Sequence, residues 1–128
     1  MRPRLSVAAG VLALAVAAAP ALSTDGADDA IEAELALGAT LFATVGCAGC
    51  HGAAGEGAGI APALAGNAFT VSPGNVAAQI LEGDGAMPPF GRALDDAAIA
   101  AIVNFVRLGL NGHADLIDAG FVAIIRGG

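Results

Sequence analysis

The sequence predicts an all-α fold. Apolar residues recur at helical spacing in three separate segments, residues 28–45, 73–82 and 96–110. Each segment opens near an aspartate or a serine, whose side-chain oxygen can accept a hydrogen bond from a free N–H group of the first helical turn. The second and third segments end at a glycine, which favours helix termination. These patterns indicate helices joined by loops.

The first predicted helix begins at Asp28 or Asp29, since Asp29 followed by Glu32 resembles a capping box. Its apolar stripe consists of Ile31, Leu35, Gly38, Phe42 and Val45. A glycine inside a helix costs about 1 kcal/mol relative to alanine. Gly38 is therefore either a point of close approach for another helix or an incidental glycine in a chain rich in Ala and Gly.

Directly after this helix comes Cys47-Ala48-Gly49-Cys50-His51, which has the spacing of c-type haem attachment. Each thiol can add to one vinyl group, and the two-residue gap lets both sulfurs reach adjacent edges of one macrocycle. The imidazole of the next residue can then face the iron. Two other interpretations stay open from these residues alone. One is a disulfide or redox dithiol, and the other is half of a zinc site, although the sequence offers no second Cys/His pair.

The middle of the chain contains a glycine-rich loop and a short helix. The loop, residues 52–59, has no Walker lysine, so we expect its glycines to let the backbone lie close to the haem edge rather than to bind phosphate. Ser72 is the expected N-cap of the short helix and Pro73 its first residue. Gly83 is expected to end this helix in a left-handed conformation.

Met87 is the second candidate site residue. It lies 36 residues after His51, and the two prolines that follow it stiffen the segment. A thioether is a soft, neutral ligand, and a His/Met pair raises the reduction potential of haem iron. The only other methionine, Met1, would leave with an export signal. We therefore predict that Met87 is the second axial ligand; the alternative is an ordinary core residue.

The final helix is expected to begin at Asp95 or Asp96 and to end at Asn111-Gly112. Its apolar face is formed by Ile99, Ile102, Val103 and Val106, with Phe105 beside it.

Residues 111–128 form a C-terminal extension whose apolar patch, residues 121–125, is expected either to fold back onto the domain or to dock a partner. His113 is a poor candidate for an iron ligand, because Met87 suits that role better. Arg92 and Arg107 could each reach a haem propionate, although we favour a solvated surface position for both.

Taken together, these landmarks resemble the small single-haem (class I) cytochrome c family of the bacterial periplasm. The matching stretches are Gly38 to Phe42, Cys47 to His51, Gly59 to Leu64, Gly85 to Phe90 and Asp95 to Arg107. The resemblance implies a cytochrome c fold, in which the N- and C-terminal helices cross and short helices and loops wrap around one covalently bound haem c. It also implies that Pro62 offers its carbonyl to the second ring nitrogen of His51, and that Phe105 packs near Gly38.

Residues 1–21 have the pattern of an export signal. Two arginines precede an apolar run over residues 5–19, and small residues follow at the cleavage positions. The alternative is an uncleaved membrane anchor, although the run is shorter than the ~20 residues that span a bilayer. We therefore divide the chain into a signal peptide (1–21), a cytochrome c domain (22–110) and an extension (111–128), and expect a periplasmic protein.

The charge balance limits the classes of partner. Removal of residues 1–21 would leave all twelve acidic residues and three arginines, a net charge of −9, and the chain has no lysine. Such a charge disfavours nucleic acid and anionic membranes as partners, and it differs from relatives that dock through a ring of lysines. Membrane association is expected only if the signal is retained. The expected partners are redox proteins, bound transiently or within a complex.

The expected function is one-electron transfer rather than catalysis. With His51 and Met87 on the iron, no coordination position is open to a substrate. No nucleophilic triad remains once both cysteines and this histidine hold the haem. The alternatives are a haem subunit of a periplasmic dehydrogenase or oxidase complex, and a haem-based sensor or peroxidase, which would require Met87 to leave the iron.

Overall fold

The computed structural model describes Ala15, Ala17 and residues 24–128, and it contains no strand in this part of the chain. Its elements are α1 (Asp25–Thr44), α2 (Cys47–His51), the 3-10 helix η1 (Ala68–Val71), α3 (Pro73–Glu82), α4 (Asp96–Asn104), the π-helical turn η2 (Phe105–Gly109) and α5 (Ala119–Gly127). The predicted all-α class is confirmed. The predicted signal segment, residues 1–21, lies outside the described residues apart from those two alanines.

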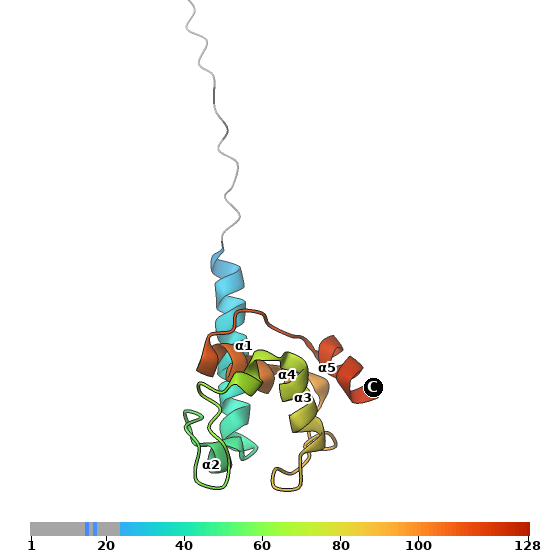
Figure 1. Cartoon of the computed structure of the whole chain (residues 1–128). Coiled ribbons are helices and arrows are strands. Elements are labelled where there is room, and N and C mark those ends of the chain that lie inside the picture. Colours follow the sequence, from blue (N-terminus) through green and yellow to red (C-terminus); the bar gives the residue numbers. More distant parts are fainter. Residues whose placement is uncertain (1–14, 16, 18–23) are drawn as a thin grey trace, which may run out of the picture.

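The crossing of α1 and α4 organises the domain (Figure 1). Gly38 is buried at this crossing, and a Cβ atom built on it would lie 2.7 Å from the Cβ of Phe105 and would collide with the carbonyl oxygen of Ala101. One turn further on, the rings of Phe42 and Phe105 pack with their centroids 5.4 Å apart. The predicted close approach at Gly38 is confirmed, because only a glycine lets the two backbones come this near.

The predicted start of the first helix is wrong. Helix α1 begins at Asp25, and its N-cap residue Thr24 makes no side-chain capping bond. Asp25 and Asp28 lie in the first turn, where acidic side chains interact favourably with the helix dipole. Asp29 and Glu32 are therefore interior helical residues rather than a capping box. The helix extends from the rest of the domain at this end, and the residues of its first turns are exposed.

The caps of the later helices follow the prediction. The Ser72 hydroxyl accepts from the Asn75 N–H at 3.3 Å, and an Asp95 carboxylate oxygen accepts from the Ala98 N–H at 2.8 Å. Gly83 ends α3 with a φ of 66°, as expected, but its ψ of −170° is extended rather than left-handed helical.

The last helix continues beyond α4 through the π-helical turn η2, which the sequence pattern did not predict. Helical structure reaches Asn111, and Gly112, with a φ of 72°, follows it as expected. The Asn111 side chain bonds to the carbonyls of Leu64 and Val106 and to the N–H of Gly66. This helix end is thus tied to the loop that follows the glycine-rich segment.

Arg107 is not a surface residue, which corrects the sequence-based preference. Its side chain is 2% exposed and lies within the fold. It donates to the carbonyls of Thr70, Val71 and Asp115, at 3.1, 3.1 and 2.6 Å, and to an Asp115 carboxylate oxygen at 2.8 Å. These acceptors satisfy the donors of a guanidinium whose burial would otherwise cost free energy. A charged side chain on a helix ordinarily faces water, but this one is held inside by acceptors in η1 and in the segment that follows the helix.

The C-terminal extension folds back onto the domain, so the first of the two alternatives for residues 121–125 is confirmed. Helix α5 packs against α3 and α4, and Val122 is fully buried between them. Ahead of α5, the buried Asn104 side chain donates to the carbonyl of Ile117 and accepts from its N–H, both at 2.9 Å. The extension is an integral part of the core. Ile124 remains on the surface with 75% of its area exposed.

We predict that Gly38→Ala lowers the free energy of unfolding by about 2 kcal/mol, because the added Cβ atom overlaps the α4 backbone. Gly26→Ala is the matched control within α1, since a Cβ atom added at Gly26 would meet nothing within 4 Å. This control should change stability by no more than about 1 kcal/mol. Thermal or denaturant unfolding of both variants measures the difference. Equal effects of the two substitutions would contradict the close approach.

The second prediction concerns acid stability. The hydrogen bond from Arg107 holds the pKa of Asp115 below its usual value of 3.8. A carboxyl group whose pKa is lower in the folded state stabilises the protein above that usual value and loses this contribution as the pH falls through its folded pKa. The wild-type unfolding midpoint should therefore fall more steeply below about pH 4 than that of Asp115→Asn. Parallel pH profiles would rule out this contribution.

Candidate functional site

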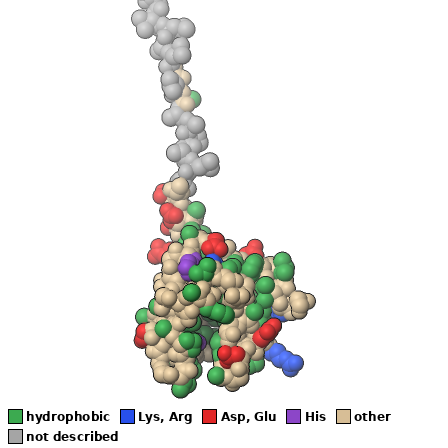
Figure 2. Space-filling model, viewed as in Figure 1, with side chains coloured by type: hydrophobic (Ala, Val, Ile, Leu, Met, Phe, Trp, Pro, Cys, Tyr) green, Lys and Arg blue, Asp and Glu red, His purple; other side chains and the backbone are tan. Residues whose placement is uncertain are grey.

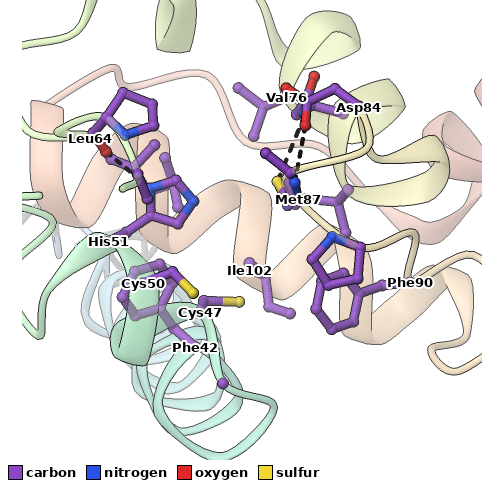
Figure 3. A pocket seen from close by; sticks show the side chains of 18 of the residues that line it. Phe42, Cys47, Cys50, His51, Leu64, Val76, Asp84, Met87, Phe90 and Ile102 are labelled. Atoms are coloured by element: carbon purple, nitrogen blue, oxygen red, sulfur yellow. Dashed lines mark hydrogen bonds between the residues drawn. The ribbon is translucent and has the colours of Figure 1, made fainter. Parts of the chain in front are cut away.

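A cavity of about 590 Å³ lies between the end of α1 with α2 on one side and the segment that follows α3 on the other. In Figure 3, His51 and the two cysteines lie on one side of this cavity, with Met87 facing them from the other. The space-filling view in Figure 2 shows the molecule hollowed between these two parts. All four predicted side chains line the cavity, so the fold brings together residues up to 40 positions apart.

The two thiols are presented by α2, a helix of a single turn. Gly46, with a φ of 100°, lets the chain turn sharply from α1 into α2. Residues three apart on such a turn point to the same side, and both Cys47 and Cys50 line the cavity as free thiols. Burial raises the pKa of the Cys47 thiol. Cys50 is exposed and is the more accessible of the two.

His51 is buried and its ring is fixed by a backbone carbonyl. The Nδ1 atom lies 2.8 Å from the carbonyl oxygen of Pro62, as the family resemblance implied. A carbonyl can only accept, so Nδ1 carries the proton of the neutral ring and Nε2 keeps a free lone pair. A hydrogen bond of this kind orients a metal-binding imidazole and increases its basicity. His51 is thus prepared to bind a metal through Nε2.

The opposite side of the cavity is formed by Met87, which two residues hold in place. The Met87 N–H donates to an Asp84 carboxylate oxygen at 2.9 Å, and the Asp84 N–H donates to the Met87 carbonyl at 3.1 Å. The side-chain amide of Gln79 lies 3.6 Å from the Met87 sulfur. Gln79 was not predicted from the sequence; its only signal is a polar side chain beside the buried Ile80 on the helix that precedes Met87.

Gly83 allows the chain to reach this arrangement. Its φ is positive, and a Cβ atom there would lie 2.8 Å from the nitrogen of Pro89 and would collide with the carbonyl of Met87. The methionine segment therefore folds back directly over the end of α3. Gly85 also has a positive φ, of 93°, but a Cβ atom added there would meet nothing within 4 Å.

The walls of the cavity are apolar, and most of them also belong to the hydrophobic core. They include Phe42, Val45, Leu64, Val76, Ile80, Phe90, Ile102 and Val106. Such walls suit a large, flat, apolar group better than a hydrated ion. Among residues 24–128, no three His, Cys, Asp or Glu side chains gather as a metal site. The zinc interpretation is therefore not supported, whereas two thiols, an imidazole and a thioether around an apolar space fit haem c.

The remaining sequence candidates are not cavity-lining residues, but Arg107 and His113 both contact one, Thr70. The Arg107 guanidinium is already bonded to Thr70, Asp115 and Val71, so the suggested propionate contact is not supported for it. For Arg92, which is exposed, that contact stays a prediction. The His113 ring lies 3.4 Å from the hydroxyl of Thr70.

An all-α domain that sets two thiols and an imidazole opposite a thioether, across an apolar cavity, has the architecture of a c-type cytochrome. Residues 33–106, more than half of the chain, match the model of a family described as cytochrome c oxidase, cbb3-type, subunit III. The chain belongs to this family of cytochrome c domains, which supports haem-based electron transfer as its general function. No curated protein and no solved structure gave a significant match.

The contacts of Gly83 give a third prediction. Gly83→Ala should lower the free energy of unfolding by about 2 kcal/mol more than Gly85→Ala, because both substitutions strain a positive φ but only the first overlaps the methionine segment. Denaturant unfolding of the two variants compares them directly. Equal losses would indicate backbone strain alone.

Proposed function

We propose that this protein is an exported one-electron carrier with a single haem c. Cys47 and Cys50 form the covalent links, and His51 and Met87 are the axial ligands. The observation that carries this proposal is the opposition of His51 and Met87 across one apolar cavity that both cysteines also line.

The residues around the cavity suit transfer of an electron with little rearrangement. Haem c supplies an iron that alternates between the ferric and ferrous states, and a His/Met pair raises its reduction potential. The Pro62 carbonyl fixes the ring of His51, and Asp84 fixes the backbone of Met87. The largely apolar walls offer few hydrogen-bond partners to water. With His51 and Met87 both holding the iron, no coordination position would be left for a substrate.

Export rests on the pattern of residues 1–21 together with the chemistry of the site. None of the helices described is long and apolar enough to cross a bilayer. We propose that the signal is cleaved and that the protein is periplasmic. In the family that this chain resembles, haem c is attached in that compartment. An uncleaved signal would instead tether the domain to the membrane.

A second candidate is a haem subunit of a larger oxidase or dehydrogenase complex. It is favoured by the family description, which names an oxidase subunit, and by the exposed Ile124 on α5. Because α5 forms part of the core, deletion of residues 111–128 would not test this candidate cleanly. Mild solubilisation of native membranes, followed by size fractionation of the full-length protein, distinguishes a complex subunit from a free carrier. Elution with larger haem proteins supports the complex, and elution as a small protein supports the free carrier.

The fourth prediction tests cofactor and ligands. The pyridine haemochrome of the exported protein should show two thioether links and one haem per chain, and Cys47→Ser should shift it to the spectrum of a single link. Met87→Ala should abolish the charge-transfer band of Met-ligated ferric haem and lower the reduction potential.

The control is Ile124→Ala, since Ile124 is neutral, exposed and outside the cavity lining, and its loss should leave the spectrum and potential of the isolated protein unchanged. A colourless exported protein in which Cys47 and Cys50 form a disulfide would refute the proposed function. A wild-type spectrum without the charge-transfer band, with rapid carbon monoxide or peroxide binding, would favour a sensor or peroxidase.

A further inference from the structure

The methionine segment, residues 83–95, has no helix or strand of its own, yet it must keep Met87 in place. On its inner side it is bound to the end of α3. The N–H of Phe90 donates to the carbonyl of Ile80 at 2.8 Å, and the N–H of Gly91 donates to that of Leu81 at 3.1 Å. These bonds fix only one side of the segment.

The outer side is held by a residue of the C-terminal extension. Arg126, in the last turn of α5, donates from Nη1 to the carbonyl of Gly91 and from Nη2 to that of Leu94 at 3.0 Å. Its Nε donates to a carboxylate oxygen of Asp96 at 2.7 Å, in the first turn of α4. The planar guanidinium suits this bridging role, because its donors point in fixed directions toward three acceptors.

The helix that carries Arg126 is itself firmly placed. Val122 of α5 is fully buried, and the Cδ1 atom of Ile125 would lie 3.8 Å from a Cβ atom added at Gly74, near the start of α3. Helix α5 contacts both α3 and α4. Arg126 therefore connects the segment after Met87 to a rigid body rather than to a mobile tail.

Two prolines connect the held part of the segment to the methionine. Pro88 and Pro89 lie between Met87 and Phe90, and their rings restrict backbone rotation. A displacement at Gly91 is therefore transmitted toward Met87 instead of being absorbed by a flexible linker. Arg126 lies outside residues 33–106, so this contact is made by a part of the chain that the family match does not include.

We propose that Arg126 is a positioning residue for the axial methionine, and that the extension holds the Met87 sulfur in its binding position. This inference rests on the proposed function, because it requires Met87 to be an iron ligand. Loss of the three contacts leaves the segment held by its bonds to α3 and by its own turn. Met87 is then less firmly positioned and competes less effectively with an external ligand.

The experiment is a titration of the oxidised holoprotein with imidazole, which competes with the methionine sulfur. Arg126→Met keeps much of the aliphatic stem and removes every donor; its affinity for imidazole should rise about fivefold, roughly the net effect of one hydrogen bond. Arg126→Lys keeps the positive charge near Asp96 but loses the planar set of guanidinium donors, and its affinity for imidazole should rise by an intermediate amount. Arg92→Met is the matched control, because Arg92 lies in the same segment, is exposed and makes no side-chain bond to any described residue.

Thermal unfolding of each variant separates positioning from general stability. A rise in imidazole affinity for Arg126→Met, with Arg92→Met at the wild-type value, supports the proposal. Unchanged affinity for Arg126→Met, even with a lower unfolding midpoint, overturns it. Equal rises in both variants also overturn it, because they would reflect the lost positive charge alone.

Failure of the proposed function gives a different result. If Met87→Ala and wild type bound imidazole equally well, Met87 would not be an iron ligand, and both proposals would fall together.

Discussion

The close approach of α1 and α4 at Gly38 is the constraint on which the rest of the structure depends. It sets the position of α2 and its thiols relative to the part of the cavity wall that α4 forms through Ile102, since α1 leads directly into α2. Any side chain at Gly38 would have to displace the α4 backbone. Local fold and site are therefore determined by the same contact.

The core and the site also share their side chains. Val76, Ile80, Ile102 and Val106 belong to the buried core and line the cavity as well. A chain with five phenylalanines and no tryptophan or tyrosine has few large side chains with which to fill such a space. A bound macrocycle would add apolar contacts to both sides at once, and any group that binds the native state alone shifts the folding equilibrium toward that state.

The parts of this architecture that could be predicted from the sequence are those controlled by short-range chemistry. The caps at Ser72 and Asp95 depend on residues within one turn, and the spacing of the cysteines and His51 encodes their grouping directly. The start of α1 was missed because an alanine-rich helix has no strong signal where it begins. A capping box at Asp29 therefore fitted the pattern better than the observed start at Asp25. Long-range partners could not be predicted in the same way. Burial of Arg107 depends on carbonyls of Thr70 and Val71, 37 and 36 residues away, and no periodicity within the last helix carries that information.

Two of the described arginines are engaged within the fold, which leaves the surface of the domain mostly negative. Of the three arginines among the described residues, Arg107 and Arg126 are engaged in ion pairs and carbonyl contacts, which leaves Arg92 as the one whose guanidinium makes no such contact in this part of the chain. Because nearly all surface charge is carboxylate, the long-range field around the domain is negative. Counterions screen such a field within roughly 10 Å at 0.1 M salt, so a basic partner would be captured fastest in dilute electrolyte.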